Sequence, residues 1–195
     1  MNPNTDQHLV ERALQGDTRA FGTLVEKYQD FIFTIALRVV KVREEAEEVA
    51  QDTFIKAFQS LSGYRGDAKF SSWLYSIAYR KALDSIRKNQ KKRNIELVEE
   101  ITEGEINTID NALHYMQEKE KKEVIQQCIL QLPEQEAVII TLYYFDDQSV
   151  KEISAITQLS EDNIKIKLYR SRKKLFTLLK QFVVPEIANN NGKAI

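Results

Sequence analysis

Apolar side chains recur at helical spacing along almost the whole chain. The clearest stretch lies between Arg43 and Leu61, where residues three and four positions apart converge on one face of a helix. That inner face comprises Ala46, Val49, Ala50, Thr53, Phe54, Ala57, Phe58 and Leu61. Alternation typical of strands is absent, and only three prolines and six glycines interrupt the 195 residues. The sequence therefore predicts an all-α fold of short helices joined by short turns.

Turn signals divide the N-terminal part into separate helices. A first apolar stripe runs from Leu9 to Leu14 and stops at Gly16, and Asp17 provides an N-cap for a second helix. The apolar run from Phe31 to Val40 predicts a third, buried helix. These helices are expected to pack with the 43–61 helix around one core.

The 43–61 helix carries an isoleucine among acidic and amide side chains on the face opposite its apolar stripe. The residues of this face are Glu48, Gln51, Asp52 and Ile55. A charged face is often simply solvated, but an exposed isoleucine inside a charged rim is typical of a protein-docking surface. We interpret the face as a docking surface for a partner with basic groups.

A loop between two glycines follows at residues 61–68, and it contains Tyr64 and Arg65. An aromatic ring and a guanidinium held out on such a loop suit the binding of an unstacked base, because stacking tolerates every base. An ordinary surface loop is the alternative.

Residues 69–93 combine aromatic groups with dense positive charge and predict one long helix. The formal net charge of −1 conceals this basic block and a second one at residues 165–174. Segregated basic blocks indicate contact with nucleic acid. A polar stripe follows Trp73 along this helix. The candidate DNA contacts of the first block lie on this stripe or next to it, and they are Trp73, Ser76, Arg80, Asp84, Arg87, Lys88 and Lys91. Asp84 and Arg87 are spaced for an ion pair.

The composition shifts after Arg93. Residues 94–118 are rich in glutamate with little apolar periodicity, which predicts a flexible acidic linker. The chain is therefore expected to form two small helical domains, at residues 1–93 and 119–184, followed by a tail at 185–195.

The second domain contains the pattern of a helix-turn-helix. Ser149 and Glu152 form a capping box for a helix to about Thr157, and Ser160 caps a second helix to about Phe182. The second helix of such a motif enters the major groove. Its candidate DNA contacts are Asn163, Lys165, Ile166, Tyr169, Arg170 and Lys173. The basic residues could serve solubility alone, but an outward Ile166 suits a thymine methyl group.

Patterns of catalytic and metal sites are absent from the sequence. We find no phosphate-binding glycine loop and no cysteine-rich metal pattern, and the two histidines, His8 and His114, are far apart. The lone Cys128 lies at the spacing of a core stripe and is expected to be buried. We expect no enzymatic activity, cofactor or metal. Without a long apolar run or a secretory signal, the chain is expected in the cytoplasm, with no membrane insertion.

Several motifs, in order and spacing, resemble a known family. Residues 9–17, 46–54, 70–78 and 84–87 resemble the first domain of bacterial sigma factors of the extracytoplasmic-function (ECF) group, and residues 132–134 and 164–175 resemble the second. The resemblance implies a dissociable subunit that brings core RNA polymerase to promoter DNA and is regulated by an anti-sigma factor. Glu48, Gln51, Asp52 and Ile55 would then dock on the polymerase clamp helices.

The resemblance also implies roles for the two basic blocks. The 61–68 loop and the helix from Trp73 to Arg87 would read and open the minus-ten element, while Lys165, Ile166, Tyr169 and Arg170 would read the minus-thirty-five element. The chain departs from the family at four positions. Arg80 replaces a common asparagine, Gln158 the usual glycine of the turn, Ser160 a proline, and Ile166 a serine on the reading face. The preferred promoter sequence is therefore not implied.

Two other functions fit parts of the sequence. A stand-alone helix-turn-helix regulator explains the second domain but leaves the Ile55 face and the aromatic loop without a role. A helical adaptor without a DNA role requires both basic blocks to serve solvation alone. Pull-down of core polymerase and salt titration of DNA binding distinguish the three functions.

Overall fold

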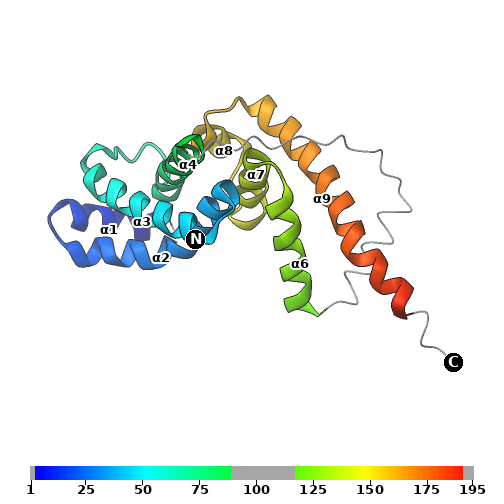
Figure 1. Ribbon diagram of the computed structural model, residues 1–195. Coiled ribbons are helices and arrows are strands. Elements are labelled where there is room, and N and C mark those ends of the chain that lie inside the picture. The colour runs from blue at the N-terminus through cyan, green and yellow to red at the C-terminus, as the bar shows by residue number, and fades with distance from the viewer. Residues whose placement is uncertain (1–2, 89–116, 191–195) are drawn as a thin grey trace.

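The computed structural model describes residues 3–88 and 117–190, and all regular structure within these ranges is helical (Figure 1). The first part holds α1 (Pro3–Leu14), α2 (Thr18–Val40), α3 (Arg43–Gln59), the short 3-10 helix η1 (Leu61–Gly63) and α4 (Phe70–Lys88). The second holds α6 (Glu118–Gln131), α7 (Glu134–Phe145), α8 (Val150–Thr157) and α9 (Glu161–Asn190). The predicted all-α fold is confirmed.

Two helices begin at the capping residues that the sequence predicts. The Asp17 carboxylate accepts hydrogen bonds from the backbone N–H groups of Arg19 and Ala20, at 3.0 and 3.3 Å, and so caps α2. Its hydrogen bond with Arg12, together with those backbone bonds, lowers the pKa of Asp17. The capping box of Ser149 and Glu152 is present at the start of α8.

Helix α2 differs from the prediction because it is continuous. The prediction placed one helix after Asp17 and another at Phe31–Val40, but α2 runs without a break from Thr18 to Val40. It ends only at Lys41, which adopts a left-handed conformation with φ 64°. No proline or glycine lies between Tyr28 and Phe31, and Asp30 sits within the continuous helix instead of capping a new one, so the two predicted helices merge.

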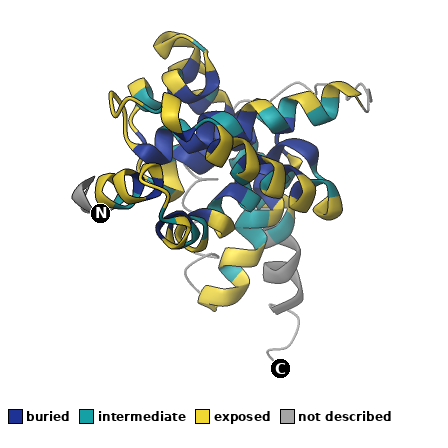
Figure 2. Ribbon diagram, turned by 90° about the vertical axis from the view of Figure 1, so that its left-hand side faces the viewer, coloured by how far each residue is buried: buried dark blue, intermediate teal, exposed yellow. Residues whose placement is uncertain are grey.

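The core of the first part is built around α2, which packs on α1, α3 and α4. Ile32, Ile35 and Ala36 of α2 are fully buried, as are Leu74 and Ala78 of α4. Buried side chains are concentrated where the helices meet, and exposed ones line the outer faces (Figure 2). This packing fixes which sides of α3 and α4 face solvent.

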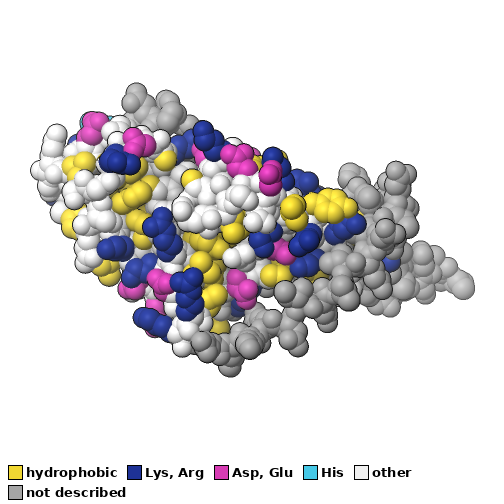
Figure 3. All heavy atoms as spheres, turned by 90° about the horizontal axis from the view of Figure 1, so that it is seen from above, with side chains coloured by type: hydrophobic (Ala, Val, Ile, Leu, Met, Phe, Trp, Pro, Cys, Tyr) yellow, Lys and Arg dark blue, Asp and Glu magenta, His cyan; other side chains and the backbone are white. Residues whose placement is uncertain are grey.

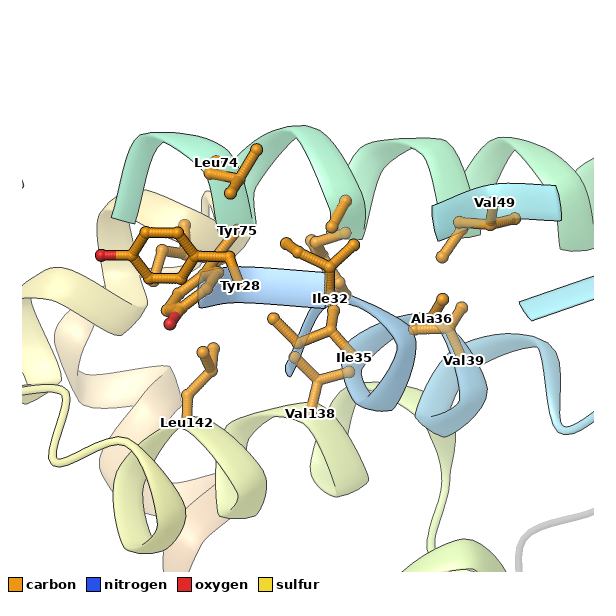
Figure 4. Packing of buried hydrophobic residues seen from close by; sticks show 14 of the residues in the cluster. Tyr28, Ile32, Ile35, Ala36, Val39, Val49, Leu74, Tyr75, Val138 and Leu142 are labelled. Carbon is orange, nitrogen blue, oxygen red and sulfur yellow. The ribbon is translucent and has the colours of Figure 1, made fainter. Parts of the chain in front are cut away.

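The two predicted domains contact each other through a shared apolar core. Helix α7 packs on α2, and α8 packs on α4. Val138 and Leu142 point from α7 toward α2 and the Tyr28 and Tyr75 rings (Figure 4). Residues 94–116 of the predicted linker lie outside the described residues, and Glu118 already belongs to α6.

Two further expectations concern the second part. Cys128 is fully buried as predicted, and burial raises the pKa of its thiol to about 11. The last helix extends further than expected, because α9 continues past Phe182 to Asn190, into the predicted tail. Residues 191–195 lie outside the described ranges.

Candidate nucleic-acid and docking interfaces

The predicted docking surface is exposed along α3. Glu48, Gln51 and Asp52 face solvent, and Ile55 is 56% exposed. Asp52 forms an ion pair with Lys81 of α4, with 3.3 Å between Oδ2 and Nζ. The surface is solvent-facing, with an apolar residue at its centre.

Phe58 corrects the prediction for the inner face of the same helix. Although its spacing places it with the buried stripe, it is 48% exposed and packs edge-on against Phe21, with 5.0 Å between ring centroids. The stripe drifts around the helix over four turns, so Phe58, its last member within α3, emerges at the rim. The exposed apolar part of α3 therefore includes Phe58 as well as Ile55.

The loop before α4 differs from its expected form. Tyr64 was expected to project outward, but it is half-buried, and its ring packs against Phe70 and Trp73 with centroids 5.7 and 5.3 Å away. Its hydroxyl donates a hydrogen bond to the carbonyl oxygen of Ala68 at 2.7 Å, and burial raises its pKa. Of the two predicted contacts only Arg65 projects into solvent, with its side chain 84% exposed and paired with Asp67 at 3.0 Å.

The polar stripe of α4 is exposed from Arg80 onward. Arg80, Asp84, Arg87 and Lys88 all face solvent, and Arg87 makes the predicted ion pair with Asp84 at 3.3 Å. Trp73, at the start of the stripe, is half-buried. Lys91 lies outside the described residues.

Ser76 is buried rather than exposed on this stripe. It is 7% exposed, donates a hydrogen bond to the carbonyl oxygen of Trp73 at 2.7 Å, and accepts one from Arg80 at 3.3 Å. Ser76 therefore orients Arg80 instead of offering a free hydroxyl. The cause is that α4 packs on more than one neighbour, so the helix leaves only a narrow exposed strip.

The predicted reading residues of α9 lie together on its first turns. Asn163, Lys165 and Arg170 are exposed, and Ile166 and Tyr169 are 48% and 58% exposed. Lys173 is half-buried, with its Nζ 5.0 Å from the centre of the Tyr169 ring. Asn163 donates its backbone N–H to Ser160 at 3.3 Å, which confirms the predicted cap. An apolar centre with basic neighbours suits a DNA groove.

The turn between α8 and α9 forms without the usual glycine. Gln158 adopts a left-handed conformation with φ 61°, and its side-chain amide donates a hydrogen bond to the carbonyl oxygen of Ala155 at 2.7 Å. The Ser154 hydroxyl donates to the carbonyl oxygen of Leu159 at 2.6 Å. Local hydrogen bonds thus hold the helix-turn-helix.

An additional polar group beside α9 was not anticipated from the sequence. Arg172 donates a hydrogen bond from Nε to the Tyr144 hydroxyl at 2.6 Å, and its guanidinium lies near the rings of Tyr143 and Tyr144. Tyr144 is half-exposed, whereas Tyr143 packs against the core. The adjacent tyrosines at the end of α7 were the only signal of this group.

Electrostatically, the molecule has mixed charge outside these strips. Seen from above, basic side chains are spread along the surface with acidic side chains and apolar patches among them (Figure 3).

Within the described ranges, His, Cys, Asp and Glu side chains do not gather into a group that could hold a metal ion. Across residues 3–88 and 117–190, no helix combines the length and apolar character needed to cross a membrane.

Family models match both halves of the chain. The model for Sigma-70 region 2 matches residues 24–92, and the model for Sigma-70, region 4 matches residues 122–175. The first match ends beside the predicted boundary at Arg93, and the second contains the helix-turn-helix.

Similar proteins and structures agree with these matches. The RNA polymerase sigma-H factor of Pseudomonas aeruginosa is 34% identical, with 86% of this chain and 90% of that protein covered. The ECF RNA polymerase sigma-E factor of Escherichia coli K12 is 32% identical, with coverage of 86% and 91%. The structure of CnrH in complex with the cytosolic domain of CnrY superposes with a TM-score of 0.64 at 25% identity, covering 91% of this chain and 98% of that chain.

A second solved structure has the same fold. RpoE from Bartonella quintana, solved with the anti-sigma factor NepR, gives a TM-score of 0.62 at 19% identity, with coverage of 82% of this chain and 96% of that chain. The two region models match in the expected order, and the two relatives are more than 30% identical over most of both chains. The chain belongs to the ECF group of RNA polymerase sigma factors.

Proposed function

We propose that this sigma factor docks on core RNA polymerase through α3, opens the minus-ten element with α4 and reads the minus-thirty-five element with α9. The observation that carries the proposal is the occurrence of three differently built exposed surfaces on one chain. They are an apolar centre with an acidic rim on α3, a basic strip on α4, and a basic strip with an apolar centre on α9.

The docking role rests on Ile55 and its acidic and amide neighbours. An exposed isoleucine surrounded by Glu48, Gln51 and Asp52 offers an apolar anchor within a charged rim. We add Phe58, because it extends the exposed apolar area at the end of α3.

The minus-ten role rests on the exposed strip of α4. Opening duplex DNA costs on the order of 1.4 kcal/mol per base-pair step, so a factor without a nucleotide motor must capture the separated strand. Arg80, Arg87 and Lys88 supply exposed positive charge. Arg65, which is exposed and paired with Asp67 in the loop, is the residue proposed to reach the strand, whereas Tyr64 supports the loop through its packing on Trp73.

The factor acts by binding and catalyses no reaction of its own. It is expected to work in the cytoplasm, where promoter DNA and polymerase are found. The CnrH structure contains a second protein, the cytosolic domain of CnrY, and the RpoE structure contains NepR, which is named as an anti-sigma factor. We infer that an anti-sigma factor also regulates this chain.

Run-off transcription with core polymerase on a randomised promoter library tests the proposed function. The chain is expected to select one family of promoters, and a product pool without enrichment would contradict the proposal. A stand-alone regulator would instead bind operator DNA equally well with and without polymerase.

The docking surface has a matched pair of variants. Ile55→Glu is expected to lower the affinity for core polymerase at least tenfold, about 1.4 kcal/mol, because it places a carboxylate in an apolar contact. Lys56→Gln lowers the charge by the same amount at an exposed position about 100° around the same helix from Ile55 and serves as the control. Equal pull-down of the two variants would refute the assignment of α3.

A further inference from the structure

The helices assigned to the two promoter elements lie close together. α4 packs directly on α8, and α8 packs on α9. Packed helices have axes 8–10 Å apart, so one intervening helix places α4 and α9 roughly 20 Å apart. The minus-ten and minus-thirty-five elements are about 25 base pairs apart by their names, or about 85 Å along duplex DNA. The described arrangement therefore cannot span both elements.

Apolar side chains make up the first contact between the two domains, where α7 meets α2 beside α4. Val138 and Leu142 of α7 are completely buried and point toward Ile35 and Tyr28 of α2 (Figure 4). Tyr75 of α4 is 1% exposed and lies beside the same cluster. Since the residues come from both predicted domains, the apolar contact favours their association.

A polar set of contacts joins α4 to the segment before and within α8. Ser72 donates a hydrogen bond to the side-chain oxygen of Gln148 at 3.1 Å, and Tyr75 donates one to Asp146 at 3.2 Å. Burial raises the pKa of the Asp146 carboxyl. Lys69 forms an ion pair with Glu152 at 2.8 Å. These three contacts fix α8 against the beginning of α4.

The end of α2 makes two further contacts with the second domain. The ammonium of Lys41 donates hydrogen bonds to the carbonyl oxygens of Leu130 and Leu132, at 2.7 and 2.9 Å. These carbonyls lie at the C-terminal end of α6, where the helix dipole favours a cation. Lys41 therefore ties the two domains together from the first domain's side.

Arg38, unlike Lys41, disfavours the contact between the two domains. It is 2% exposed, and it donates hydrogen bonds to the Thr141 hydroxyl and to the backbone and side-chain oxygens of Gln126, all of which are neutral. Burial lowers its pKa to about 10, so it remains charged at neutral pH. Burying a cation against neutral oxygens opposes closure. The buried cation thus lowers the free energy that competing contacts must supply to separate the domains.

We propose that this arrangement is a closed, self-inhibited form of the factor, in which the second domain must leave α2 and α4 before the promoter can be bound. The inference rests on the function proposed above. In helix-turn-helix complexes the first helix crosses the DNA backbone. Here that helix, α8, is packed on α4 instead. Polymerase docking and promoter spacing supply the competing contacts that open the form.

A cleavable cross-link across the Lys69–Glu152 contact tests the proposal. The full chain with Lys69→Cys and Glu152→Cys is treated with a bis-maleimide whose spacer contains a disulfide, and transcription is measured before and after cleavage. The native Cys128 can stay, because it is fully buried and its raised pKa keeps it a protonated thiol. Each sample is its own control, since cleavage changes only the tether.

The tethered factor is expected to lose at least about tenfold in transcription from its selected promoter, and cleavage is expected to restore it. Equal transcription by tethered and cleaved protein would overturn the proposal. If the cleaved double variant and the unmodified chain both fail to transcribe, the proposed function itself is wrong. The two failures are therefore distinguishable.

A charge-reversal variant tests the same point from the opposite side. Lys41→Glu places a negative charge beside the carbonyl end of α6 and should open the closed form. It should lower the cross-linking yield and reduce, by several-fold, the factor concentration needed for half-maximal transcription. Lys122→Glu, an equal charge change at an exposed position of α6, is the control. Equal cross-linking yields and equal half-maximal concentrations for Lys41→Glu and Lys122→Glu would count against the closed form.

Discussion

Helix α4 and the first turns of α9 are assigned the same kind of task, but they are placed very differently. α4 packs on α2, α3 and α8, and even Ser76 on its polar stripe is buried. The α9 residues Ile166 and Tyr169 are about half exposed. The comparison teaches that the exposed side chains of α9 can change without disturbing the fold, whereas most side chains of α4 contribute to packing.

A pair of truncations should expose this difference most strongly. Leu142→Ala, beneath α2, is expected to lower the free energy of unfolding by about 2–5 kcal/mol, because it leaves a cavity between the two domains. Ile166→Ala should change it by less than about 0.5 kcal/mol, since its side chain is exposed. Urea unfolding followed by circular dichroism measures both, and equal losses would erase the distinction.

Replacing the apolar centre of α9 should alter DNA recognition without altering stability. Ile166→Ser is expected to change the preference at one base pair of the minus-thirty-five element by about 1–3 kcal/mol. Selection from a library randomised at that element, with holoenzyme, provides the measurement. Gln181→Ala, an exposed change further along α9, is the control. An unchanged preference would show that Ile166 does not contact a base.

The ion pair at the covered end of α4 predicts a pH dependence. Burial opposes ionisation of Glu152, but hydrogen bonds from Lys69 and Ser149 outweigh it and lower its pKa below 4.5. A carboxyl with a lowered pKa stabilises the folded chain above its unfolded value, and this contribution is lost as pH falls through the folded value. Between pH 7 and pH 3, the wild type should therefore lose about 1 kcal/mol more than Glu152→Gln.

Urea midpoints at the two pH values provide the measurement. Lys121→Gln, which removes a charge from an exposed pair with Glu118, is the control and should show the wild-type pH dependence. Parallel loss in the wild type and Glu152→Gln would contradict the role of the ion pair.

The smallest effect is expected at the turn that presents α9. Gln158→Gly relieves a left-handed conformation, but it also adds chain entropy and removes the hydrogen bond to Ala155. These contributions nearly cancel, so the free energy of unfolding should change by less than about 1 kcal/mol. Gln158→Val, which is strained at this φ, should be clearly less stable by thermal denaturation. Equal melting temperatures would show that the turn carries no strain.

Local features could be predicted from the sequence because they depend on neighbouring residues. The Asp17 cap, the Ser149 capping box, the helix-turn-helix and the exposure of Ile166 all follow from spacings of a few residues. The exposure of Ile55 follows in the same way, since this residue interrupts a polar face of one helix.

Features set by distant contacts could not be predicted in this way. Tyr64 turns inward because Trp73 and Phe70 offer it an aromatic surface, and glycine spacing carries no information about that surface. Ser76 is buried for a similar reason. The contact between the domains has one further sequence signal, because α7 is apolar on every side from Ala137 to Ile140.

That all-round apolar α7 has a consequence for recombining domains between relatives. One side of the helix belongs to the core of its own domain, while Val138 and Leu142 fit the surface of α2 formed by Tyr28 and Ile35. A chimera that imports a foreign second domain brings side chains shaped for another α2. If α9 reads the promoter as proposed, its exposed residues are therefore best exchanged alone, while α7 is kept together with α2.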